Sequence, residues 1–82
     1  MNVFKTLDLR GLSFFSGFEQ TQKAFRGVKV NGVLEVILDP QKNFTHAFKE
    51  WAQAEGHSTS DIDESNQMIR LFIRKVSQHR KN

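Results

Sequence analysis

The chain has 82 residues, a formal net charge of +3 and no cysteine. A chain of this length forms one domain with a modest core. Without cysteine, these residues hold no disulfide, thiolate nucleophile or zinc–thiolate site. No apolar run reaches the roughly 20 residues that a membrane-spanning helix needs, and the first residues do not resemble a secretory signal. We therefore expect a cytoplasmic protein without membrane association.

The charges are unevenly distributed along the sequence. An acidic stretch without Lys or Arg contains Glu55, Asp61, Asp63 and Glu64, and a basic end without acids contains Arg70, Arg74, Lys75, Arg80 and Lys81. This asymmetry is compatible with electrostatic steering of a partner. It is equally compatible with the solvated edges of two neighbouring strands, so both interpretations stay open.

The first half of the chain predicts a strand, a helix and a second strand. Residues 3–9 alternate in polarity, as in a half-buried strand. Ser16 and Glu19 have the spacing of a capping box, which predicts a helix with Ser16 as its N-cap. The apolar stripe of this helix is Phe18, Thr21, Phe25 and Val28. After a turn at Asn31-Gly32, the nearly continuous apolar run 33–38 indicates a central strand.

The second half predicts another helix and a hairpin. Asp39 is expected to cap the helix, with Pro40 at its first position and Gly56 at its end. The apolar positions of this helix are Phe44, Ala47, Phe48 and Trp51. Residues 57–63 and 68–76 form the predicted strands, joined by a turn at 64–67. In the last strand, Ile69, Leu71 and Ile73 alternate with Arg70, Phe72 and Arg74.

The predicted order is therefore βαβαββ. Two helices with one apolar stripe each can cover only one face of a four-stranded sheet. The predicted fold class is an α+β two-layer sandwich, with a four-stranded mixed sheet covered on one face by two helices. We expect a single domain over residues 1–76, followed by a basic C-terminal tail at 77–82.

Several short motifs carry a family resemblance. The pattern Leu7-Asp8-x-x-Gly11-Leu12 resembles the opening of the TusA/SirA/YedF-type small sulfur carriers. The resemblance continues through Asn31-Gly32, Asp39-Pro40, Trp51 and Gly56-His57, and covers roughly residues 6–75. It implies the same two-layer fold. It also implies that a cysteine at the position of Phe14 would carry sulfur as a persulfide between partner proteins.

The sequence departs from this family at the site itself. Phe14, Phe15 and Gly17 stand where the family has its cysteine and two prolines. The interval from Pro40 to Trp51 is also about two residues longer than usual, and its acidic-Ile-Pro element is missing. A phenyl ring cannot form a persulfide, since that chemistry needs a thiolate. No catalytic residue is therefore predicted, and Ser13 and Ser16 have no histidine near them in sequence to act as a base.

The aromatic residues near the expected cysteine position suggest binding instead. Phe14, Phe15 and Phe18, with Arg10 beside them, have the composition of an interface hot spot. The alternative is that one or both of Phe14 and Phe15 fold down and complete the core. The three histidines lack metal-ligand spacing, with His57 placed to meet the C-terminal dipole of a helix. Neither a metal nor a cofactor is predicted.

A second candidate surface is the face of the sheet that the helices leave open. Arg70, Phe72 and Arg74 are expected there, joined by Phe4 and by either Val33 and Ile37 or Leu34 and Val36. Such a face suits a dimer contact or single-stranded nucleic acid.

The favoured hypothesis is a cysteine-less, TusA-like module that binds a protein partner, which is a sulfur-relay enzyme, a regulator or a second copy. The alternatives are an RNA- or single-stranded-DNA-binding module and an accessory component of a sulfur-relay sulfurtransferase system. The accessory would use a cysteine lent by its partner.

Overall fold

The computed structural model describes residues 3–77, and the side chains of 61–63 are excluded from the description. The predicted element order is confirmed: β1 (Val3–Asp8), α1 (Phe14–Arg26), β2 (Val33–Leu38), α2 (Thr45–Ala54), β3 (Ser58–Glu64) and β4 (Ile69–Arg74). The predicted basic tail lies outside the described residues from position 78 onward. Within residues 3–77, neither helix is long and apolar enough to cross a membrane.

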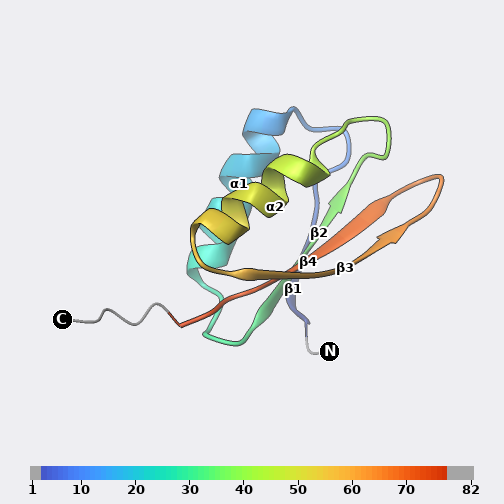
Figure 1. The fold of residues 1–82 in the computed structure, drawn as a ribbon. Coiled ribbons are helices and arrows are strands. Elements are labelled where there is room, and N and C mark those ends of the chain that lie inside the picture. Colours follow the sequence, from blue (N-terminus) through green and yellow to red (C-terminus); the bar gives the residue numbers. More distant parts are fainter. Residues whose placement is uncertain (1–2, 78–82) are drawn as a thin grey trace.

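The four strands form one mixed sheet in the order β1-β2-β4-β3. β1 runs parallel to β2, whereas β4 is antiparallel to both β2 and β3. Figure 1 shows α1 and α2 lying together on one side of this sheet, with the other side uncovered. The α+β two-layer sandwich predicted from the sequence is thereby confirmed.

The core lies between the helices and the two central strands. Leu34, Val36 and Leu38 of β2 are at most 1% exposed, as are Leu71 and Ile73 of β4. They belong to one buried cluster with Phe25 of α1 and Phe48 of α2. Since side chains alternate across a strand, the intervening residues of β2 and β4 face away from the helices.

α1 begins earlier than the sequence predicts. Its N-cap is Ser13, whose hydroxyl accepts a hydrogen bond from the Ser16 N–H at 3.2 Å, so the prediction of Ser16 as the cap is wrong. An extended residue with an acceptor side chain, three positions before the amide it serves, is the usual N-cap geometry. Phe14 and Phe15 consequently lie in the first turn of the helix instead of in the loop before it.

α2 begins later than predicted, at Thr45, so the assignment of Asp39 as its cap and Pro40 as its first residue is wrong. The Asp39 carboxylate accepts a hydrogen bond from the Gly11 N–H at 2.8 Å. It therefore stabilises the loop before α1 and is not available as a helix cap. The predicted end of α2 is confirmed, because Gly56 has a φ of +83° and donates to the Gln53 carbonyl at 3.0 Å.

The turn into β2 leaves no room for a side chain at Gly32. A Cβ there would lie 2.9 Å from both the Lys29 carbonyl oxygen and Val28 Cγ1. We predict that Gly32→Ala lowers the free energy of unfolding by about 1–3 kcal/mol through overpacking. Gly27→Ala is the matched control, because its Cβ meets nothing closer than 3.6 Å. Urea denaturation of both variants would test this, and equal stabilities would contradict it.

Candidate functional site

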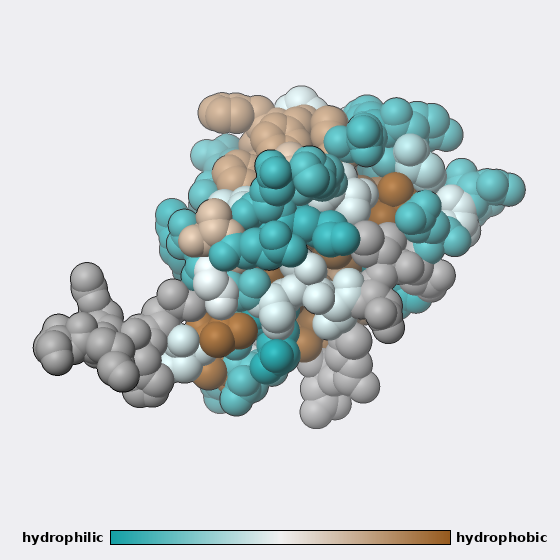
Figure 2. Space-filling view, viewed as in Figure 1, coloured by the Kyte–Doolittle hydropathy of each residue, from teal (hydrophilic) through white to brown (hydrophobic). Residues whose placement is uncertain are grey.

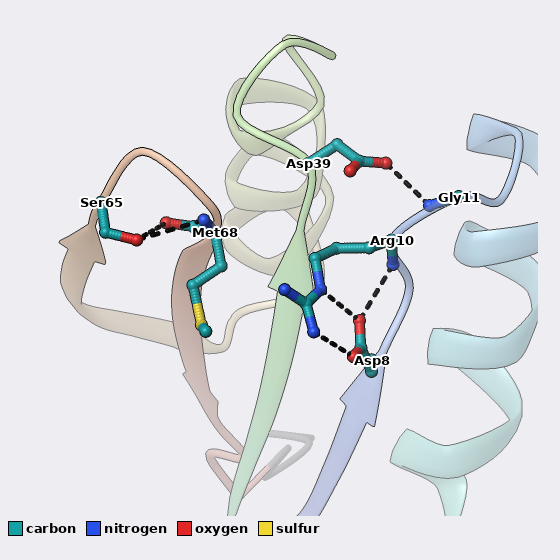
Figure 3. Close-up of polar contacts among 6 residues, drawn as sticks. All are labelled: Asp8, Arg10, Gly11, Asp39, Ser65 and Met68. Carbon is teal, nitrogen blue, oxygen red and sulfur yellow. Dashed lines mark hydrogen bonds and ion pairs between the residues drawn. The ribbon is translucent and has the colours of Figure 1, made fainter.

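The junction between β1 and α1 is held by contacts from the end of β2 and from the segment that follows it. Leu9 is buried and its N–H donates to the Ile37 carbonyl at 2.9 Å. Gly11 has a φ of +86°, a left-handed conformation that glycine adopts without strain. Asp39 accepts from the Gly11 N–H (Figure 3), and Lys42 Nζ donates to the Leu12 carbonyl at 3.1 Å. The start of α1 is therefore fixed relative to the sheet.

Phe14 occupies the first position of α1 and packs inward. Its ring stacks on Phe18 with centroids 5.4 Å apart and meets Phe44 edge-on at 5.2 Å. It also lies 5.6 Å from the ring of Phe48, which is fully buried. Phe18 continues the cluster with an edge contact to Trp51 at 5.6 Å. Phe14 and Phe18 thus act together as packing residues between the two helices.

Phe15 behaves differently from its neighbour. It is 79% exposed, the most exposed of the large hydrophobic residues described. Figure 2 shows apolar side chains gathered at the top of the molecule, over the start of α1. The side chain that extends into solvent at this site is therefore that of Phe15, whereas Phe14 packs between the helices.

Arg10 is engaged with its neighbour Asp8. Its Nε and Nη2 donate to the two carboxylate oxygens at 2.9 and 2.7 Å, and its backbone N–H adds a third bond at 3.1 Å. The Arg10 hydrogen bond holds the pKa of Asp8 below its usual value. Figure 3 shows the Arg10 side chain reaching from the loop toward β2, on the side away from α1. Arg10 therefore extends on the side of the loop away from α1, the helix that contains Phe15.

The position where the family resemblance places a cysteine offers no reactive atom. Phe14 has no lone pair or titratable proton with which to bind sulfur or metal. Within the described part of the chain, no group of three or more His, Asp or Glu residues is placed to hold a metal ion. His46 is exposed, and its Nε2 lies 3.1 Å from a carboxylate oxygen of Glu50 on the same helix.

The open face of the sheet contains an acid that sequence reasoning missed. Glu35, opposite Phe72 in the register, is only 5% exposed although no helix covers it. It accepts hydrogen bonds from Thr6 Oγ1 at 2.7 Å and from Arg70 Nε. Glu35 is the only charged residue in the apolar run 33–38, and this position could have indicated a buried acid with partners on the neighbouring strands.

Arg70, Phe72 and Arg74 do share this open face, because they alternate with the buried Leu71 and Ile73. Arg70 lies over the Phe72 ring at 5.6 Å while donating to Glu35. Arg74 Nη1 is 3.5 Å from the Asn31 side-chain oxygen. From β2, Val33 and Ile37 lie on this open face, whereas Leu34 and Val36 face the helices. The charge of Arg70 is thus already compensated within the fold.

His57 lies at the far end of the helices, in the wall of a pocket of about 330 Å³ that Trp51 and Lys75 also line. Its Nδ1 accepts a hydrogen bond from the Val76 N–H at 3.0 Å. Burial, and then the charge of Lys75, lowers the pKa of His57. Nδ1 therefore serves as an acceptor, and the end of α2 is met by the His57 backbone N–H, which donates to the Ala52 carbonyl at 2.8 Å.

The fold and the site define a class of protein: a small βαβαββ domain whose site lies where the first strand passes through a glycine turn into the first helix. The family model described as "Sulfurtransferase TusA" matches residues 5–75, and the chain therefore belongs to the TusA family.

One curated relative is the Bacillus subtilis (strain 168) protein named "Putative sulfur carrier protein YrkF". The chain is 28% identical to it over 79 residues, which cover 96% of this chain and 42% of YrkF. The chain thus spans less than half the length of that relative.

The different environments of the two adjacent phenylalanines lead to a stability prediction. Phe14→Ala removes three ring contacts and is expected to lower the free energy of unfolding by about 2 kcal/mol, less than for a fully buried ring. Phe15→Ala, at an exposed position, should change it by no more than about 0.5 kcal/mol. Thermal and urea denaturation measure both, and the reverse order would contradict this account of the site.

His57 leads to a prediction about pH. Because the folded state lowers its pKa, the unfolded chain binds a proton more readily below the ordinary value of about 6.5. Stability is therefore full above that pH and falls as the pH drops toward the folded pKa. His57→Asn keeps an acceptor for the Val76 N–H and should remove this component of the pH dependence.

The exposed His46→Asn is the matched control for that experiment. Urea denaturation of the three proteins at about pH 5.5 and about pH 7.5 compares them across the range where histidine titrates. If His57→Asn loses as much stability on acidification as the unmodified protein, this assignment of His57 is wrong.

Proposed function

We propose that the chain is a non-catalytic TusA-family module that binds a protein partner through a surface centred on Phe15. One pair of observations supports the proposal: Phe14, at the position where the resemblance places a cysteine, packs against other rings, and the adjacent Phe15 is 79% exposed. A cytoplasmic location, as expected from the sequence, is part of this proposal.

The surroundings of Phe15 favour a tight contact over a loose one. The residue lies in the first turn of a capped helix, and Phe14 beside it is held by three aromatic neighbours. A phenyl side chain has few rotatable bonds, and on a fixed helical turn it loses little conformational entropy when a partner covers it. Aromatic anchors of this kind contribute about 2 kcal/mol or more to an interface when they become fully buried.

The electrostatics of the site favour a partner with a carboxylate beside its apolar pocket. The first turn of α1 contains no acidic residue, so the partial positive charge of the helix N-terminus is not compensated from within the helix. Arg10 lies on the other side of the loop and uses only Nε and Nη2 in its contact with Asp8. Its remaining donors are proposed to orient the partner at the rim.

The family suggests the kind of partner. Members described as sulfurtransferases and sulfur carriers pass sulfur between proteins, so an enzyme of a sulfur relay is our first candidate, ahead of a regulator or a second copy. In that setting the chain would act as an accessory that occupies a carrier's docking place without accepting sulfur. Nucleic-acid binding is not favoured, because Arg70, a central cation of the open face, is paired with Glu35.

The proposal predicts a selective loss of the partner. We expect Phe15→Asp to abolish its retention in an affinity pull-down from lysate of the cells that make the protein, followed by mass spectrometry. Gln20→Asp is the matched control, since Gln20 is also exposed on α1 but lies more than one helical turn beyond Phe15. Urea denaturation of both variants checks that the fold survives.

Two outcomes would overturn the proposal. One is a partner that folded Phe15→Asp retains as well as the unmodified protein, which would remove this surface from consideration. The other is sulfur transfer in a reconstituted relay that depends on this chain and is unchanged in Phe15→Asp. That result would mean that the chain contributes to the reaction by another route.

A further inference from the structure

We propose that the chain has a second docking surface at the opposite end of the molecule, which accepts an acidic protein segment carrying one apolar side chain. The surface is a hollow of about 320 Å³ lined by Val3, Phe4, Lys29, Val30, Asn31 and Gly32, here called the basal hollow. It is independent of the function proposed for the Phe15 surface.

Exposed apolar residues concentrate at the basal hollow. Among the described residues, four large hydrophobic side chains are exposed, and three of them line it: Val3 at 38%, Phe4 at 52% and Val30 at 52%. The fourth is Phe15, at the other end of α1. Single exposed apolar residues are ordinary, but a group of them around one depression marks an interaction site.

The fold holds this depression in a fixed shape. Val3 of β1 pairs with Val33 of β2, which brings the N-terminal ends of these strands together. The loop before β2 is tied to the chain after β4, because Asn31 N–H donates to the Lys75 carbonyl at 2.7 Å and Lys75 N–H donates to the Gly32 carbonyl at 2.9 Å. Val30, adjacent to this anchored turn, is therefore held at the surface with little freedom to withdraw.

The charges around the basal hollow are of one sign. Lys29 lines it, and Arg74 Nη1 approaches the side-chain oxygen of Asn31, another lining residue, to 3.5 Å. The lining contains no acid, and the sequence from 20 to 34 contains none either. A partner with carboxylates flanking an apolar group would therefore find complementary charge here, whereas a basic partner would be repelled.

The shape of the basal hollow favours one of the occupants that such charge attracts. An anionic membrane is engaged by a protruding apolar face, whereas here the exposed apolar side chains surround a shallow depression that can receive one residue. Its volume lies at the small end of the range for ligand pockets, which suits one inserted side chain. An acidic peptide segment with a central Leu or Phe fits both the charge and the shape.

The test uses the full chain and a fluorescein-labelled peptide with a central Leu-Phe pair flanked on both sides by Asp and Glu. Fluorescence anisotropy at low ionic strength should detect binding, and replacing Leu-Phe by Ser-Ser should weaken it about tenfold or more. Val30→Asp and Lys29→Glu should each cause a comparable loss. Phe15→Asp should leave the affinity unchanged, so failure here is distinguishable from failure of the proposed function.

Amide chemical-shift changes on peptide addition should centre on Asn31 and Gly32. The proposal is overturned if the Ser-Ser peptide binds equally well, if Val30→Asp leaves the affinity intact, or if the shifts centre elsewhere. It is also overturned if the labelled peptide does not bind, whether or not vesicles of phosphatidylserine and phosphatidylcholine do. Urea denaturation of each variant ensures that a lost affinity reflects the surface.

Discussion

The inward packing of Phe14 is the interaction on which the rest of the site depends. Successive residues of an α-helix are rotated by about 100°, so placing Phe14 among Phe18, Phe44 and Phe48 obliges Phe15 to point elsewhere. The same packing joins the start of α1 to α2. Phe14 therefore packs inward at the position where the resemblance places a cysteine, and this packing leaves the ring of Phe15 exposed.

The open face of the sheet is stabilised in a different way. Glu35 is almost fully buried there, and its two carboxylate oxygens accept from Thr6 of β1 and Arg70 of β4. Removing any one of these groups would leave a buried charge or polar group without a partner, which is destabilising. Covering a face whose central polar groups are already hydrogen-bonded to one another releases less free energy than covering a uniformly apolar face. The two ends of the molecule are therefore more favourable contact surfaces than the open face of the sheet.

The sequence predicted what depends on local periodicity and missed what depends on distant partners. Element order, the buried faces of β2 and β4 and the end of α2 follow from patterns within a few residues. The start of α2 was wrong because its determinant is tertiary: Asp39 bonds to Gly11, 28 positions away. Glu35 was missed for the same reason, since its partners lie 29 and 35 positions away. The start of α1 is set locally, by a Ser13 hydroxyl that accepts from the Ser16 N–H. The capping-box pattern therefore predicted a serine N-cap correctly but placed it three residues too late, at Ser16 in place of Ser13.

The two exposed apolar surfaces lie at opposite ends of α1, as Figure 1 shows for the start of that helix and the loop that follows it. The helix between Phe15 and Arg26 alone spans about 16 Å, at 1.5 Å per residue. Contacts at the two ends would therefore not exclude each other sterically. A carrier that shuttles sulfur must release each partner. If both proposals hold, this chain, which has no cysteine, is instead suited to hold two proteins at once.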